Sequence, residues 1–171
     1  MQIAAPAVPT AMTLLTSQFL HGSVLHIFFN MLFLAAFGPQ VEYVTGHVRF
    51  VILYLLCGVL GGIAQISVMP GSHVPGLGAS GAIAGILGAY IVRFPTHRVG
   101  RVPALVVIGL WAAIQFVHGF GALSSRASDQ AGGTAYFAHI GGFLAGVFLG
   151  SAAGRGRLAS AAQGRRYRYY Y

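Results

Sequence analysis

Four polar side chains in this 171-residue chain have types that suit peptide hydrolysis: Ser80, His139, His26 and Asn30. A serine becomes a nucleophile when a neighbouring histidine accepts its proton. An asparagine and a second histidine can donate hydrogen bonds to the oxyanion that forms on the attacked carbonyl. The residue types therefore suggest acyl-transfer chemistry that starts at a serine.

Other routes to hydrolysis lack the residues that they need. A metal-dependent route requires a ligand set such as HExxH, and the sequence contains no such motif. An aspartyl route requires two carboxylates inside the membrane, but the only acids, Glu42 and Asp129, lie outside the apolar runs described below. Neither acid is suitably placed to complete a triad, so the sequence permits a serine–histidine dyad.

The composition indicates that these side chains lie in a membrane protein. Hydrophobic residues make up 56% of the chain and charged residues 7%, with a mean hydropathy of +0.74. A soluble domain carries about a quarter charged residues, so a soluble fold could not cover its surface. Five uncharged runs are long enough to cross a hydrocarbon core of about 30 Å. These are Val24–Val41, Phe50–Met69, Gly76–Val92, Val102–Phe120 and Ala135–Ala153. The sequence predicts an all-α, polytopic transmembrane helix bundle with five spans.

Arginine placement predicts the orientation. Nine of the ten arginines lie in one set of loops and in the C-terminal tail, and only Arg126 lies on the other side. Because positive loops stay in the cytoplasm, we expect an external segment at 1–20, a membrane domain at 21–153 and a basic cytoplasmic tail at 154–171.

The net charge of +8 would suggest nucleic acid in a soluble protein. Here the arginines flank apolar spans, so we expect the lipid bilayer as a partner and no nucleic acid. A lysine-free chain rich in arginine, alanine and glycine hints at a bacterial source and at the bacterial inner (plasma) membrane.

The candidate polar side chains converge at one depth. Spans one, three and five run in the same direction, and His26, Ser80 and His139 each lie near the start of one of them. At 1.5 Å of rise per residue, all three fall within about 10 Å of the outer boundary. Asn30 lies one turn deeper, on the same face as His26. A serine at the start of a helix also has a free backbone N–H and the positive end of the helix dipole.

Two rows of glycine predict which helices meet. The rows are Gly81, Gly85 and Gly88 in span three, and Gly142, Gly146 and Gly150 in span five. Small residues at this spacing let two membrane helices approach closely. His139 shares the face of Gly142 and Gly146, so we expect this row to bring it toward the helix that begins at Ser80.

Three motifs, in this order, resemble those of the rhomboid family of intramembrane serine proteases. They are the HGxxxHxxxN-like residues His21–Asn30, the GxSG-like residues Gly78–Gly81 and the AHxxGxxxG-like residues Ala138–Gly146. The resemblance runs from about His21 to Gly150, which is nearly the whole chain.

The resemblance implies that Ser80 is the nucleophile and His139 the base of an endopeptidase that cleaves transmembrane proteins, without a metal or cofactor. It implies two supporting sets of residues. Those for the oxyanion or the water are His26, Asn30 and Gly78, and those that support the site are His21, Gly81, Gly142 and Gly146.

Two features differ from the family pattern. The family core has six spans and a Trp-Arg pair in a loop after the first, so the resemblance implies that this chain lacks the first helix and that pair. Some members also carry, four positions after the serine, an aromatic residue that stacks on the catalytic histidine, and Ala84 stands there in this chain. Gln115 and Trp111 are interpreted as packing residues.

Two other functions are compatible with parts of the sequence. One is an inactive rhomboid-fold protein that binds transmembrane helices, since loss of the first helix could disable catalysis. The other is a haem or metal carrier with His26 and His139 as ligands, which would leave Ser80 and Asn30 unexplained.

Overall fold

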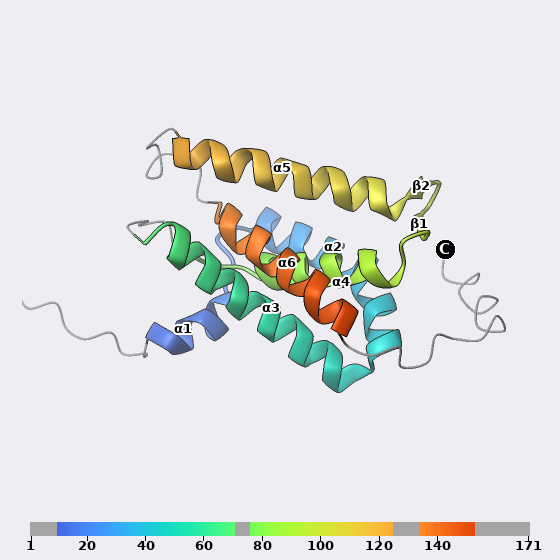
Figure 1. Ribbon diagram of the computed structural model, residues 1–171. Coiled ribbons are helices and arrows are strands. Elements are labelled where there is room, and N and C mark those ends of the chain that lie inside the picture. Colours follow the sequence, from blue (N-terminus) through green and yellow to red (C-terminus); the bar gives the residue numbers. More distant parts are fainter. Residues whose placement is uncertain (1–9, 71–75, 125–133, 153–171) are drawn as a thin grey trace, which may run out of the picture.

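The computed structural model describes residues 10–70, 76–124 and 134–152. These residues form a helical bundle (Figure 1), so the predicted all-α fold class is confirmed. In chain order the elements are α1 (Thr10–Thr16), the 3-10 helix η1 (Ser17–Phe19), α2 (Val24–Thr45), α3 (His47–Val68), α4 (Ser80–Arg93), strands β1 (Arg98–Val99) and β2 (Val102–Pro103), α5 (Ala104–Ser124) and α6 (Tyr136–Ala152). The predicted cytoplasmic tail lies outside the described residues.

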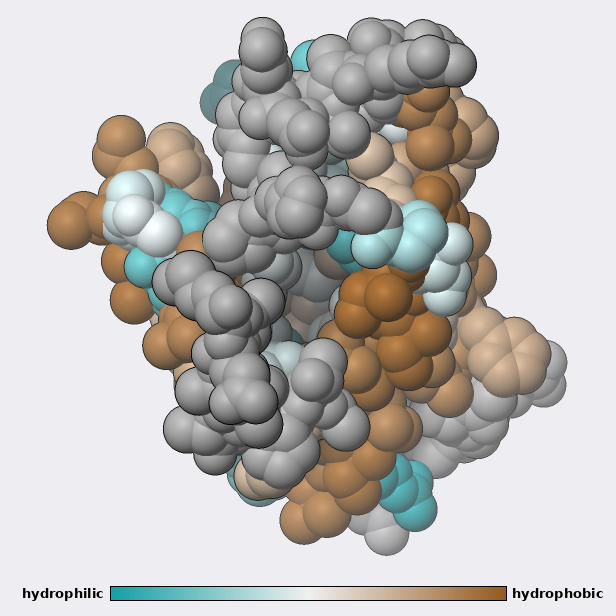
Figure 2. Space-filling model, turned by 90° about the vertical axis from the view of Figure 1, so that its left-hand side faces the viewer, coloured by the Kyte–Doolittle hydropathy of each residue, from teal (hydrophilic) through white to brown (hydrophobic). Residues whose placement is uncertain are grey.

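Three of the described helices are long and apolar enough to cross a membrane: α2, α3 and residues Ala104–Gly121 of α5. The helices α4 and α6 are apolar but have only 14 and 17 residues, fewer than the about 20 of a typical full crossing. The prediction of five spans therefore corresponds to three full-length helices and two shorter ones. Large apolar side chains point outward on the long helices, and hydrophobic residues cover much of the coloured surface (Figure 2). This is the surface of an integral membrane protein.

Helix α4 is the buried centre of the bundle. Every residue from Gly81 to Tyr90 is buried, as expected of a helix that is apolar on all sides. The predicted third span begins at Gly76, and within it the helix begins at Ser80, as expected. Gly78 has a φ of +115°, which an α-helix cannot use, so the residues before Ser80 form an irregular approach to the helix.

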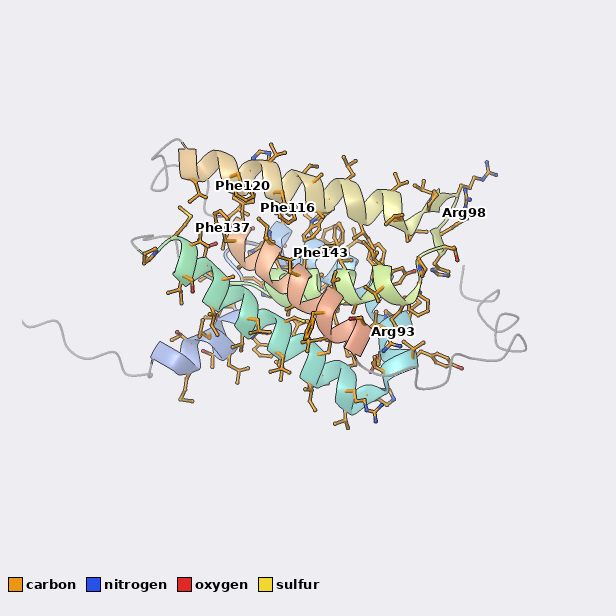
Figure 3. The ribbon with its side chains drawn as sticks, in the orientation of Figure 1. Arg93, Arg98, Phe116, Phe120, Phe137 and Phe143 are labelled. Atoms are coloured by element: carbon orange, nitrogen blue, oxygen red, sulfur yellow. The ribbon has the colours of Figure 1, made fainter. Side chains whose placement is uncertain are left out.

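The helices α2, α4 and α6 run in one direction, and α3 and α5 run in the opposite one (Figure 1). The predicted parity of the spans is thus confirmed, and Ser80 and His139 lie toward the same end of the bundle. Arg93, the last residue of α4, and Arg98 both lie at the other end (Figure 3). There, β1 and β2 pair antiparallel and lead into α5.

Helices α4 and α6 make the most extensive contact in the bundle. A Cβ on Gly142 would overlap the carbonyl oxygen of Gly81, and one on Gly146 would overlap the carbonyl oxygen of Gly85. The two glycine rows therefore meet as predicted, and backbone packs directly on backbone.

The segment before α2 also packs against the bundle. Helix α1 contacts α3, and η1 contacts α4. The side chain of Gln18, in η1, is only 3% exposed. Its Nε2 donates to the carbonyl oxygens of Leu14 and Leu55, and Gly58 leaves the space that this amide fills. Residues 10–19 are thus in contact with the membrane domain, although the sequence had assigned them to a separate segment. An external position for them stays a prediction.

Candidate active site

The structure brings Ser80 and His139 into direct contact. Nε2 of His139 lies 2.7 Å from Oγ of Ser80, a hydrogen-bond distance. Ser80 is the first residue of α4 and His139 lies one turn into α6. The contact depends on the glycine packing described above, because Gly142 lies on the same face of α6, one turn beyond His139.

The second nitrogen of His139 meets a residue that the sequence analysis had assigned to packing. Nδ1 of His139 lies 2.7 Å from Oε1 of Gln115 on α5. The ring of Trp111, one turn earlier on α5, lies 6.0 Å from the His139 ring between centroids, with an interplanar angle of 37°. A single amide inside an apolar run was the only sequence signal for this contact. The sequence does not say which helix that amide meets.

At Gly78, the loop that precedes Ser80 packs closely against α2. A Cβ at this position would lie 2.7 Å from the ring of His26 and 3.7 Å from Nδ2 of Asn30. The positive φ and the missing space both require glycine here. The backbone N–H of Gly78 donates to the carbonyl oxygen of Ser17 at 2.9 Å, so it is not free to bind an oxyanion. Gly78 contributes to the site through the space that it leaves.

Asn30 carries a buried donor without an acceptor. Its side chain is 7% exposed, and its Nδ2 has no hydrogen-bond partner among residues 10–70, 76–124 and 134–152. The ring of His21 lies edge-on to that of His26, 5.2 Å away between centroids. Buried polar groups are normally paired, so an unpaired donor beside a serine suggests a position for a ligand atom.

A cavity of about 470 Å³ opens above the pair. Its lining comes from α2, α4, α5, α6 and the loops before them, and it includes His26, Asn30, Ser80, Trp111 and His139. Four of the predicted site residues therefore face one space. A group bound there would meet the serine hydroxyl and the donors of α2 together.

A second cavity, of about 320 Å³, reaches Ser80 from the side of α1 and α3. Gln18, Gln65, Gly78 and Ala138 are among its lining residues. This space was not expected from the sequence, because residues 1–20 were predicted to be separate from the membrane domain. Ser80 thus lies at a wall that two cavities share.

Hydrophobic contacts fix the region between α5 and α6. Phe120 meets Phe137 edge-on, with centroids 6.1 Å apart, and Phe116 stacks on Phe120 (Figure 3).

In the part of the chain that the structure describes, no group of three or more His, Cys, Asp or Glu residues is placed to hold a metal ion. The structure does bring together a serine hydroxyl, a histidine ring and nearby hydrogen-bond donors.

A helical membrane bundle with a serine–histidine pair at the wall of a cavity defines the class of protein. The family model of the rhomboid domain matches residues 9–156. The chain belongs to the rhomboid family, as its motifs predicted.

Relatives of known name carry the same domain. The chain is 35% identical over 148 residues to Rhomboid protease GluP of Bacillus subtilis (strain 168). The matched region covers 82% of this chain and 26% of that protein. It is 35% identical over 140 residues to RHOMBOID-like protein 4 of Arabidopsis thaliana, covering 80% of this chain and 32% of that protein. It is 32% identical over 143 residues to the human Presenilin-associated rhomboid-like protein, mitochondrial, covering 79% of this chain and 36% of that protein. The chain thus spans about a quarter to a third of the length of these relatives.

Proposed function

We propose that this chain is an intramembrane serine endopeptidase that hydrolyses peptide bonds in or near the transmembrane segments of other proteins. Ser80 is the nucleophile and His139 the general base. The observation that carries the proposal is the 2.7 Å contact between His139 Nε2 and Ser80 Oγ at the wall of a cavity that His26 and Asn30 also line. Membership of a family that includes a named protease, GluP, supports it. Ser80 and His139 are both present and in contact, so the pair gives no support to the alternative of an inactive helix-binding protein.

In the proposed reaction, Ser80 Oγ attacks the carbonyl carbon of the scissile bond while its proton passes to His139 Nε2. The negative charge that develops on the carbonyl oxygen is stabilised by three donors: the Ser80 N–H, the Asn30 amide and the His26 ring. Collapse of this intermediate breaks the C–N bond, and the leaving amine takes the proton from His139. Water then attacks the acyl-enzyme with His139 again acting as the base, which releases the acid and restores Ser80.

The free N–H of Ser80 follows from its place in the chain. As the first residue of α4 it has no intrahelical acceptor, and the positive end of the helix dipole favours an anion there. The oxyanion donors thus come from the start of α4 and from one face of α2.

The proposed orientation has the reactive pair toward the outer face and the C-terminus in the cytoplasm. It is supported by the arginines: Arg93 and Arg98 lie at the end of the bundle opposite Ser80 (Figure 3). The proposed partners are transmembrane substrates that reach the cavity from the lipid. The bacterial plasma membrane is proposed as the location from composition alone.

The test is cleavage of a single-span protein in liposomes that contain the purified full chain. We expect the substrate to be cut at one position in or near its span, and mass spectrometry of both fragments identifies the bond. Ser80→Ala in the same liposomes should leave the substrate whole. Equal cleavage by wild type and Ser80→Ala would contradict the proposal.

A further inference from the structure

We propose that Gln115 is a positioning residue, which holds His139 in the tautomer that carries its hydrogen on Nδ1. This leaves Nε2 free to accept the proton of Ser80. The inference rests on the proposed function and adds a third side chain, from a different helix, to the pair. Gln115 acts through His139 and is not among the residues that line the cavity above Ser80.

The two hydrogen bonds of His139 are compatible with one tautomer. Its Nδ1 lies 2.7 Å from Gln115 Oε1 and its Nε2 lies 2.7 Å from Ser80 Oγ. With the Gln115 amide turned so that Oε1 faces His139, the hydrogen is on Nδ1 and is donated to Gln115, because a carbonyl oxygen only accepts. A neutral imidazole has a single N–H, so Nε2 then has a lone pair and Ser80 must be the donor. The other tautomer would leave Gln115 Oε1 facing a lone pair, and His139 could not act as a base toward Ser80.

The position of Gln115 on α5 indicates that the amide is there for this contact. Among the α5 residues whose burial is described, four are buried, and their spacing puts them on one face: Ala104, Ile108, Gln115 and Gly119. The other three are apolar or lack a side chain, whereas Gln115 buries an amide to 9% exposure. Burying an unpaired amide is costly, and an apolar side chain would pack the same face without that cost. The hydrogen bond to His139 offsets the cost.

Trp111 completes the support from α5. It lies one turn before Gln115, and its ring lies beside that of His139, tilted by 37° with 6.0 Å between centroids. Ala84, four residues after Ser80, has no ring to offer. The orientation of the base therefore depends on α5, which contacts the bundle less extensively than α4 and α6 contact each other.

The first experiment compares Gln115→Met with Gln115→Glu in the purified full chain, with a fluorophosphonate probe of the reactive serine. Methionine keeps the length of the side chain without an acceptor oxygen, and glutamate keeps an acceptor in either protonation state. We expect Gln115→Met to lower the maximal labelling rate about tenfold or more, as the loss of an oriented base requires, while the probe concentration for half-maximal rate stays the same. Gln115→Glu should stay within about threefold of wild type. Gln40→Met is the matched control, because it removes another buried amide far along α2.

Two results would overturn the inference. One is labelling of Gln115→Met at the wild-type rate. The other is an equal loss in Gln115→Met and Gln115→Glu while both keep the wild-type unfolding temperature, since the acceptor oxygen would then be irrelevant.

A second measurement does not depend on activity or on the folding of a variant. Protein with ¹⁵N-labelled histidine rings reports which nitrogen of His139 carries hydrogen, and His139→Ala assigns the signals. We expect protonated Nδ1 and bare Nε2 in the wild type, and a mixture in Gln115→Met. A wild-type His139 protonated on Nε2 would overturn the inference by itself. A tautomer set by Gln115 in a chain that the probe never labels would instead count against the proposed function alone.

Discussion

Gly142 of α6 lies directly against the carbonyl oxygen of Gly81 in α4, with no room for a side chain between them. This contact sets the distance between two helices that carry one reactive residue each. Ser80 and His139 are 59 positions apart in the chain, and the packing of glycine on backbone brings their side chains within hydrogen-bond reach.

The glycine packing predicts the effect of adding one methyl group. We expect Gly146→Ala to lower the unfolding free energy by about 1–3 kcal/mol or more, because its Cβ would overlap the carbonyl of Gly85, and backbone cannot move aside like a side chain. Thermal unfolding in detergent measures this. Gly109→Ala is the control, since a Cβ there meets nothing within 4 Å, and its stability should stay the same or rise. Equal unfolding temperatures for Gly146→Ala and wild type would contradict the packing.

Gly78 tests the approach to the nucleophile. We expect Gly78→Ala to reduce proteolysis strongly, because the added Cβ strains a backbone with φ of +115° and pushes on the ring of His26. The matched control is Gly76→Ala, two residues earlier, where a Cβ meets nothing within 4 Å. Substrate cleavage in liposomes measures both variants. If the two variants cleave equally well, the assigned role of Gly78 is wrong.

Asn30 tests the oxyanion donors. We expect Asn30→Leu to lower the turnover rate about 10²–10³-fold, the usual effect of removing one such donor. Stability should fall little, since its Nδ2 has no partner to lose among the residues that the structure describes. Turnover and unfolding temperature are measured on the same preparation, with Leu32→Ala on the exposed side of α2 as the control. A variant that unfolds at a lower temperature yet keeps its turnover would make Asn30 structural.

Cys57, the single cysteine of the chain, reports on the core. It is fully buried, between Gly85 of α4 and the backbone of α6. We expect it to resist a membrane-permeant maleimide in the native bundle and to react once the protein is unfolded. A cysteine placed at the exposed start of the same helix, as Val48→Cys in a Cys57→Ala background, should react at once. Rapid reaction of native Cys57 would show that α3 does not pack on α4 and α6 as described.

The sequence predicted the parts of the site that follow from spacing within a helix. His26 and Asn30 share a face because they are four residues apart, and the glycine rows identify the pair of helices that pack together. The start of α4 at Ser80 also agrees with the expectation from the sequence, although the uncharged run that contains it begins earlier, at Gly76.

Contacts between helices were harder to predict. Gln115 lies in an apolar run that contains none of the three motifs. Only the packing of α5 against α6 brings it to His139. Gln18 lies in a segment without charge or a long apolar run, yet it is buried against α3 through the space left by Gly58. Both depend on how elements distant in sequence pack, which the spacing of residues within one helix does not encode.

The most direct test of the central claim is labelling of the purified chain with a fluorophosphonate probe, followed by identification of the modified residue. We predict a single adduct on Ser80, lost in Ser80→Ala and in His139→Ala, because the attack needs both the hydroxyl and its base. Ser151→Ala, at the other end of α6, and His47→Ala, whose side chain is 92% exposed, should label like wild type. An adduct on another residue, or labelling that survives the loss of His139, would contradict a Ser80–His139 dyad.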